Sequence, residues 1–191
     1  MSVVVEPGLK LSERQGLPDA LRVLLEQHPR ADWGQNAHFH GLSAYWLDRH
    51  LLFRRIQLAL TADAQAVLDR ELSGEDWHPR LARLAQMQVS ELHGHHMIED
   101  AQYFPILRDR DRRLVRGFDI LDADHEALDG HLIDLITATR EALTGPRDGG
   151  KLIDMAAGFH RHLLGFGRLL ERHLDDEEDL IVPVLLEYGD P

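Results

Sequence analysis

Residues 95–105 read HHMIEDAQYFP, and residues 173–183 repeat the pattern, with changes, as HLDDEEDLIVP. Both stretches begin with His-x-x-x-Glu, continue with an acidic residue and reach a proline six positions after the glutamate. Residues four apart lie on one face of an α-helix, so the histidine and the glutamate of each stretch point the same way. Such a pair can bind a cation from a single helix. The two pairs are His95 with Glu99 and His173 with Glu177.

Hydrophobic periodicity predicts two further long helices, one from about residue 36 to residue 72 and one from about 114 to 143. We expect Pro79 to lie near the start of the second helix, which ends near Pro105. The last helix should follow the glycine-rich break at residues 145–150. No stretch alternates with the period of a β-strand. The sequence therefore predicts an all-α fold, an up-down-up-down four-helix bundle.

A shorter segment precedes the bundle. Residues 1–35 predict an irregular lead-in and a short extra helix from about Pro18 to Gln27, with the proline in the first turn. That helix ends at His28, because the residue before a proline is pushed out of helical geometry. We therefore divide the chain into an N-terminal part, residues 1–35, and a bundle domain, residues 36–191.

Single histidines lie in the apolar stripes of the first and third predicted helices. His50 stands between Trp46 and Phe53, and His125 stands where an apolar residue is expected. A lone histidine in such a stripe is more often a hydrogen-bonded core residue than a ligand. However, burying four imidazoles and two carboxylates in one layer is costly unless positive charge compensates them. We therefore predict a metal pair bridged by both glutamates, with the ligands His50, His95, Glu99, His125, His173 and Glu177.

Composition limits the classes of partner and cofactor. The chain has 191 residues, 43% of them hydrophobic, which suits one globular domain. Its net charge of −12 argues against nucleic acid or an anionic membrane surface as a partner. The chain contains no cysteine, so nitrogen and oxygen must hold any metal. It shows neither a signal peptide nor a membrane-spanning stretch, and we expect a cytoplasmic protein.

The order and spacing of these residues resemble the haemerythrin-like, or HHE cation-binding, family of four-helix non-haem di-iron proteins, over roughly residues 36–187. Ferritin-like bundles use Glu-x-x-His pairs with lone glutamates, whereas the lone residues here are histidines. The resemblance implies two iron ions and a small-molecule ligand, namely dioxygen, peroxide or nitric oxide. It is carried by His50, by His95 and Glu99 with Asp100 and Phe104-Pro105, by His125, and by His173 and Glu177 with Glu178 and Pro183.

The chain departs from the oxygen-carrying members of that family on its third helix. Those proteins resemble it but place a second histidine four residues after the first, where this chain has Asp129. The four-histidine, two-glutamate set is similar to that of the bacterial repair-of-iron-centres proteins, which are linked to nitrosative and oxidative stress. Those usually add a cysteine-bearing N-terminal segment. We expect Asp129 to be an outer partner of His125, and both irons to keep open positions unless Asp129 or His96 supplies a bond.

Most of the other histidines are expected on the surface or at helix ends, because their helical positions turn them away from the predicted ligands. His96 stays open, since it adjoins His95 and can turn towards the second metal. His162 shares the face of His173 but lies too far along the helix to bind the same ion. The expected surface and capping histidines are His28, His38, His40, His78, His93 and His131.

Three functions follow from these patterns. The first is a di-iron protein that binds or reacts with dioxygen, peroxide or nitric oxide, with a role in oxidative or nitrosative stress. The second is a non-catalytic iron or oxygen sensor whose folding depends on its metal. The third is a structural site for zinc or manganese. The pattern favours the first function and leaves the enzyme and the sensor as alternatives.

Overall fold

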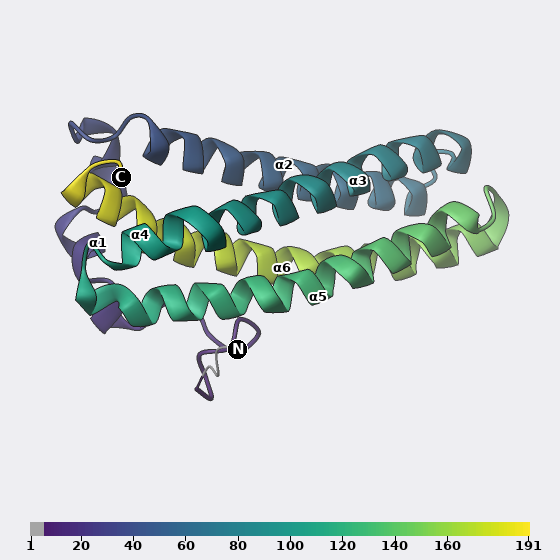
Figure 1. Ribbon diagram of the computed structural model, residues 1–191. Helices are drawn as coiled ribbons and strands as arrows, with labels where there is room; N and C mark the ends of the chain where they lie inside the picture. The colour runs from purple at the N-terminus through teal and green to yellow at the C-terminus, as the bar shows by residue number, and fades with distance from the viewer. Residues whose placement is uncertain (1–5) are drawn as a thin grey trace. The chain divides into compact units, whose positions relative to one another are not determined.

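The computed structural model describes residues 6–191, which form α-helices joined by turns, with no β-strand among them. Figure 1 shows the helices in chain order from purple to yellow. No described helix is long and apolar enough to cross a membrane. The prediction of an all-α helical bundle is confirmed. The helices are α1 (Val23–Gln27), α2 (Leu42–Leu68), α3 (Gly74–Ile98), α4 (Phe104–Arg108), α5 (Val115–Thr144) and α6 (Gly149–Tyr188).

Shorter helical turns lie before and between these helices. The π turn η3 (Glu99–Tyr103) joins α3 to α4, and the N–H of Phe104 donates to the carbonyl of Glu99. The first long helix is shorter than predicted at both ends. Gly41 before it and Arg70 after it adopt left-handed φ values of 53° and 62°, which interrupt helical geometry. The short helix predicted from Pro18 divides into a 3₁₀ turn and α1. The 3₁₀ turns are η1 (Asp19–Leu21), η2 (Arg30–Gln35) and η4 (Arg112–Leu114).

The second helical run, made of α3, the π turn and α4, begins earlier and continues further than the predicted second helix. Ser73 caps α3, since its hydroxyl accepts a hydrogen bond from the N–H of Asp76 at 3.1 Å. Pro79 is therefore inside α3 and not at its start. Pro105 does not end the helical run, because it occupies the first turn of α4, where a proline tolerates the lack of an N–H.

The described residues divide into two compact units, and each is described separately. Unit 1 comprises residues 6–51, 95–127 and 169–191. Unit 2 comprises residues 52–94 and 128–168. Every residue predicted as a metal ligand belongs to unit 1.

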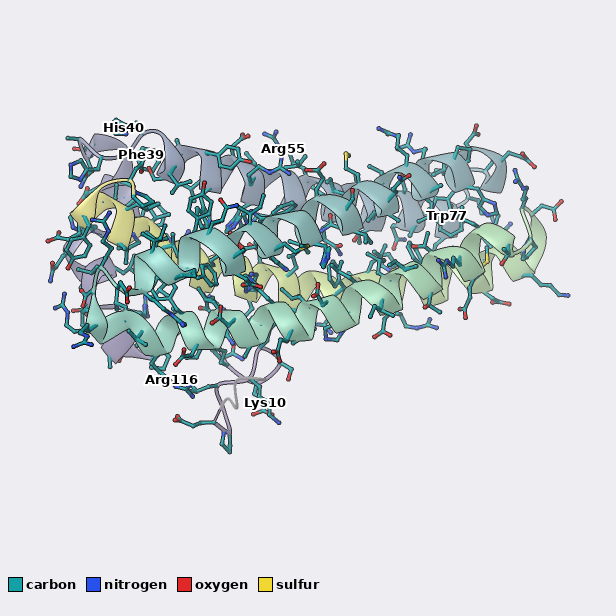
Figure 2. All side chains as sticks on the ribbon, in the orientation of Figure 1. Lys10, Phe39, His40, Arg55, Trp77 and Arg116 are labelled. Carbon is teal, nitrogen blue, oxygen red and sulfur yellow. The ribbon has the colours of Figure 1, made fainter. Side chains whose placement is uncertain are left out.

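Unit 2 combines an apolar core with charged contacts at its surface. Trp77, labelled in Figure 2, is fully buried and packs edge to face on Phe159, with ring centroids 6.0 Å apart. Arg80 on α3 forms a bidentate ion pair with Asp63 on α2, with N–O distances of 2.6 and 2.7 Å. These contacts join the α2 and α3 segments of the unit, and join α3 to α6.

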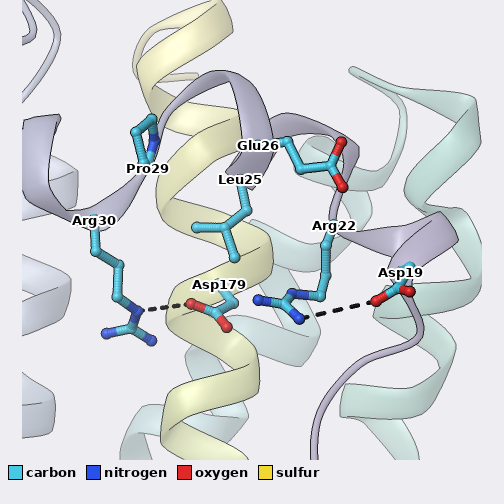
Figure 3. A pocket seen from close by; sticks show the side chains of 7 residues that line it. All are labelled: Asp19, Arg22, Leu25, Glu26, Pro29, Arg30 and Asp179. Carbon is cyan, nitrogen blue, oxygen red and sulfur yellow. Dashed lines mark hydrogen bonds and ion pairs between the residues drawn. The ribbon is translucent and has the colours of Figure 1, made fainter.

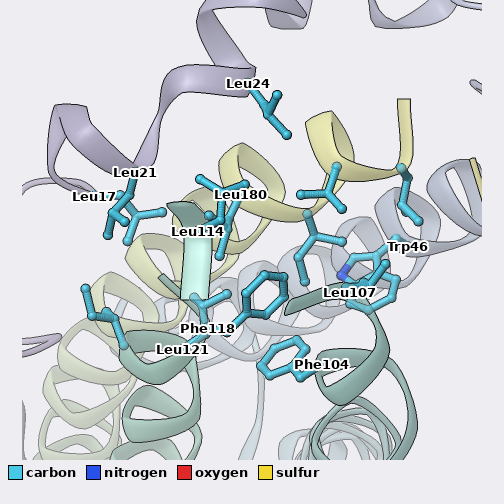
Figure 4. Packing of buried hydrophobic residues seen from close by; sticks show 14 residues of the cluster. Leu17, Leu21, Leu24, Trp46, Phe104, Leu107, Leu114, Phe118, Leu121 and Leu180 are labelled. Carbon is cyan, nitrogen blue, oxygen red and sulfur yellow. The ribbon is translucent and has the colours of Figure 1, made fainter. Parts of the chain in front are cut away.

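In unit 1, the N-terminal segment is part of the core. Leu17, Leu21 and Leu24 pack in one buried cluster with Phe118 and Leu180 (Figure 4). Leu25 and Trp33 pack on Val182 and Leu186 of α6. Figure 1 shows α1 beside the C-terminal part of α6, drawn in yellow. The residues before α2 therefore bury apolar surface of the unit that carries the predicted ligands.

Candidate metal centre

Seven potential ligand side chains meet in unit 1, in two groups whose ligand atoms lie within 4.8 Å of one another. They come from α2, α3, the π turn η3, α5 and α6. All six predicted ligands are brought together, and His96 joins them. The first of the two groups, which we call the mixed group, consists of His50, His95, Glu99 and Glu177. The second, the histidine group, consists of His96, His125 and His173.

Glu177 on α6, a member of the mixed group, also contacts the histidine group. Its Oε1 is 3.6 Å from Nε2 of His50, and its Oε2 is 3.1 Å from Nε2 of His173. The indole N–H of Trp46 donates a hydrogen bond to Oε1. The carboxylate is fully buried. Its two carboxylate oxygens therefore face histidines of different groups.

Glu99 is arranged in the same way at the start of the π turn. Its Oε1 is 2.7 Å from Nε2 of His95, and its Oε2 is 3.5 Å from Nε2 of His125. The first contact follows from the helical spacing of four residues that the sequence predicts. Like Glu177, Glu99 directs one oxygen towards the mixed group and the other towards the histidine group.

Buried ring nitrogens of the histidine group lack hydrogen-bond partners. Both ring nitrogens of His96 are in this state. Nε2 of His125 and Nε2 of His173 form no hydrogen bond either, although carboxylate oxygens lie 3.5 and 3.1 Å from them. The rings of His96 and His125 stack, with centroids 4.0 Å apart. A buried polar group without a partner costs about 1–3 kcal/mol. Imidazole nitrogens beside carboxylate oxygens are suitable ligands for iron, zinc or manganese, so these side chains fit metal ions.

Carboxylates outside the two groups hold the far ring nitrogen of three histidines. Such contacts fix the tautomer and the ring orientation, and leave the other nitrogen for a metal. Two of the carboxylates directly follow a glutamate of the repeated motif, and the third precedes His125. The contacts are His50 Nδ1 to Glu178 Oε1 at 3.0 Å, His125 Nδ1 to Asp100 Oδ1 at 2.7 Å, and His173 Nδ1 to Asp124 Oδ2 at 3.4 Å.

Burial and charge shift the pKa values of the clustered groups in opposite directions. Burial raises the pKa of Glu99 well above its usual value, and the charge of Glu177 raises it further. Burial also acts to raise the pKa of Glu177, but His50 and His173 outweigh it and hold this pKa well below its usual range. Burial lowers the pKa of His95 to about 3. Although burial acts to lower the pKa of His173, the nearby carboxylates of Asp124 and Glu177 raise it to about 9.

Asp129 is not the outer partner of His125 that we expected. It contacts Nδ1 of His93 at 3.1 Å, and both side chains are about half exposed, at 47% and 51%. The outer partner of His125 is Asp100. The histidine group takes its additional imidazole from His96 on α3. Its position three residues before Glu99, on the same helical face, is the sequence signal for this role.

The predictions for the other histidines mostly agree with the structure. His38, His40 and His93 are exposed. His78 contradicts them, because it is 3% exposed and neither of its ring nitrogens has a hydrogen-bond partner. It lies in unit 2 beside Trp77, and burial lowers its pKa. The surface prediction was wrong because α3 begins at Gly74, which places His78 inside the helix.

Comparison with known proteins identifies one family. The family model described as the haemerythrin HHE cation binding domain matches residues 42–187, which include both ligand groups. No curated protein and no solved structure gives a significant match. The described residues 6–35 lie before the matched region.

Proposed function

The chain belongs to the haemerythrin HHE cation-binding domain family, and from that premise we propose that it binds two iron ions through which it binds or reacts with a small molecule. The family membership establishes a cation-binding protein. Our proposal adds the number of ions, their identity as iron, and the class of small molecule, which is dioxygen, peroxide or nitric oxide. A role in oxidative or nitrosative stress belongs to the same proposal.

The observation that carries the proposal is the placement of Glu99 and Glu177. Each directs one oxygen towards a histidine of the mixed group and the other towards a histidine of the histidine group. A carboxylate between two sets of imidazole nitrogens is suited to bridge two metal ions. We infer that the histidine group holds one ion, that His50 and His95 hold the other, and that both carboxylates are shared.

The two proposed ions have unequal ligand sets. Three histidines serve one ion and two serve the other, so the ion beside His50 and His95 keeps the more open coordination. When bound, iron supplies a Lewis-acidic and redox-active centre at that position. His95 is the one ligand of the two groups that is not fully buried. We infer that a small molecule approaches the site beside His95.

Aromatic rings line the side of the site near His95. The ring of Trp46 stands edge-on to that of His95, with centroids 5.9 Å apart, and to that of Tyr103, with centroids 5.4 Å apart. Trp46 is 2% exposed and also donates to Glu177. The buried indole of Trp46 holds Glu177 in place, and Tyr103 packs against that indole, so this side of the site is apolar. These rings therefore support a site for a small, weakly polar molecule.

The first test is the metal content of the protein purified without added metal, together with its visible spectrum. We expect two irons per chain. Glu99→Ala should lower the content of both ions, because both share this carboxylate. His93→Ala is the matched control, since its exposed side chain lies outside both groups. One metal per chain, or zinc alone after growth in iron-sufficient medium, would contradict the di-iron proposal.

The unequal ligand sets also favour a second candidate, a sensor or carrier that binds the small molecule reversibly. Reversible binding at a single metal needs one ion that is saturated by protein and one that is open. His96 supplies a third histidine to one ion, so the expectation from Asp129 that both ions are open loses its support. Cycling the reduced protein between oxygen and vacuum tests this. A visible band that appears and vanishes over many cycles indicates a carrier or sensor, and lasting oxidation indicates an enzyme.

A further inference from the structure

Residues 6–35 lie before the matched family domain but in the same compact unit as both ligand groups. Two arginines of this segment, Arg14 and Arg30, contact carboxylates that in turn hold ligand histidines. The family resemblance and the ligand repeat concern residues further along the chain. The role of the segment therefore has to be derived from its own contacts.

Arg14 reaches the outer partner of His173. Its guanidinium is buried, with 2% of the side chain exposed, and both of its terminal nitrogens donate to the carboxylate of Asp124, Nη1 at 2.7 Å from Oδ1. Oδ2 of that carboxylate is 3.4 Å from Nδ1 of His173. The Nε of Arg14 donates to Asp176 at 2.7 Å. Arg14 therefore fixes the carboxylate that orients one member of the histidine group.

Arg30 reaches the outer partner of His50 by a parallel route. Its Nη1 donates to Oε2 of Glu178 at 2.7 Å, and Oε1 of Glu178 is 3.0 Å from Nδ1 of His50. Its Nε donates to Asp179 at 2.7 Å, a contact that Figure 3 shows beside the half-exposed Arg22. The guanidinium thus bonds two neighbouring carboxylates of α6. Arg30 holds a carboxylate on the mixed group as Arg14 does on the histidine group.

Further contacts attach the segment to α6 independently of Arg14. The backbone N–H of Leu17 donates to Asp176 at 3.1 Å. Arg172 donates to the carbonyl of Gln15 at 2.7 Å, and also to the Asp176 carboxylate at 2.7 and 3.0 Å. None of these bonds involves Arg14, so we expect them to remain when Arg14 is replaced. The effect of Arg14 on Asp124 can therefore be tested without detaching the segment.

We propose that the N-terminal segment is a positioning element of the metal site, with Arg14 acting through Asp124 on His173 and Arg30 acting through Glu178 on His50. A guanidinium fork fixes the plane of the carboxylate it bonds, and that carboxylate fixes its imidazole. Each arginine then serves a different proposed ion. Loss of an outer partner of a metal ligand typically costs about 10–100-fold in metal affinity. The proposal rests on the proposed function, since it requires bound metal.

The test is the affinity of the full chain for Fe(II), measured without oxygen by competition with a coloured chelator that resolves both ions. Arg30→Gln should weaken one ion by about 10–100-fold and leave the other unchanged. Arg14→Gln should weaken the other ion, and the double variant should weaken both, because the two routes share no residue. Arg30→Lys should restore part of the affinity, because it keeps the charge but loses the fork.

The matched control is Arg80→Gln, which removes a bidentate pair with Asp63 in unit 2. We expect the control to lower the melting temperature of the metal-free protein and to leave both Fe(II) affinities unchanged. If Arg14 and Arg30 have a purely structural role, their glutamine variants will behave in the same way. That result would overturn the inference and leave the di-iron proposal intact. A wild-type protein that binds no metal would overturn both.

If Arg14→Gln fails to fold because Asp124 loses its counter-charge, the Arg14→Lys variant, which keeps the positive charge, is used in its place. Arg30, whose side chain is 43% exposed, can be changed with less risk to the fold. Unchanged Fe(II) affinities in Arg30→Gln and Arg14→Lys would then refute the inference. A selective loss of one ion in each variant would support it.

Discussion

Replacing His96 with leucine should have opposite effects on the metal-free and on the metal-loaded protein. In the metal-free protein the ring of His96 is 2% exposed and neither ring nitrogen has a hydrogen-bond partner. Leucine has a similar volume and no polar atoms, so His96→Leu removes an unsatisfied buried group. In the loaded protein the same change removes one of three imidazoles from an ion.

The magnitudes follow from burial and from mass action. Relief of the unsatisfied imidazole contributes about 1–3 kcal/mol to the metal-free protein. For a chain of this length that corresponds to a rise in melting temperature of roughly 2–12 °C. If free iron is kept at about 1,000 times its dissociation constant, one bound ion contributes about 4 kcal/mol. Complete loss of that ion would reduce the metal-induced increase in melting temperature by roughly 8–16 °C, which is the upper limit for a variant that keeps two of the three imidazoles.

The assay is thermal unfolding with and without iron, combined with metal analysis of the same samples. His93→Leu on the same helix is the control, because His93 is half exposed and outside both groups. We expect His96→Leu to raise the melting temperature of the metal-free protein, to weaken the binding of the ion in the histidine group and so to reduce the metal-induced increase in melting temperature. A variant that keeps two ions and the full metal-induced increase would show that His96 is not a ligand.

Three further predictions concern the metal-free protein. Because the pKa of His173 is raised to about 9, its stabilising contribution is complete below about pH 6.5 and is lost as the pH rises to 9. The melting temperature of the wild type should thus fall more steeply between pH 6.5 and 9 than that of Asp124→Asn, because this variant weakens the pairing of His173 with residue 124. Equal slopes in the two proteins would contradict a stabilising role of that pairing. Trp46→Phe removes the donor to the charged Glu177 and should cost about 1.5–3 kcal/mol in urea unfolding, and an unchanged midpoint would contradict this role. Ser73→Ala removes the cap of α3 and should lower the free energy of unfolding by about 1 kcal/mol in the same assay. An unchanged free energy of unfolding would show that the cap does not stabilise the helix.

The helical content and the six predicted ligand positions could be derived from spacing alone. His50 and His125 interrupt apolar stripes, and each His-x-x-x-Glu pair stacks on one helical face, so the predicted ligands converge if the helices pack by those faces. The 2.7 Å contact between His95 and Glu99 is the direct result of that spacing. Such local regularities survive folding because they depend only on helix geometry.

The errors arose where contacts between helices, or helix ends, decided the outcome. Asp129 lies one turn from His125 on α5, but its carboxylate contacts His93 on the neighbouring helix α3 instead. His78 was assigned to the surface because Pro79 resembled a helix start, whereas the Ser73 cap places the start earlier. The contacts of Arg14 with residues more than a hundred positions away have no periodicity from which they could be predicted.

The π turn at Glu99–Tyr103 changes the direction in which side chains point between the part of unit 1 that carries the ligand groups and the part that forms the apolar cluster. In an ordinary α-helix, residues five apart point in directions about 140° apart. In the π turn the N–H of Phe104 bonds to the carbonyl five residues back, so each turn takes more residues than in an α-helix and the directions of Glu99 and Phe104 come closer together; both side chains are 1% exposed. The same run can thus present Glu99 to the ligand groups and Phe104 to the apolar cluster. Removing one residue from this turn would rotate the downstream helix by about 100° relative to the upstream one. The helix could then keep either its ligands or its apolar core in register, but not both.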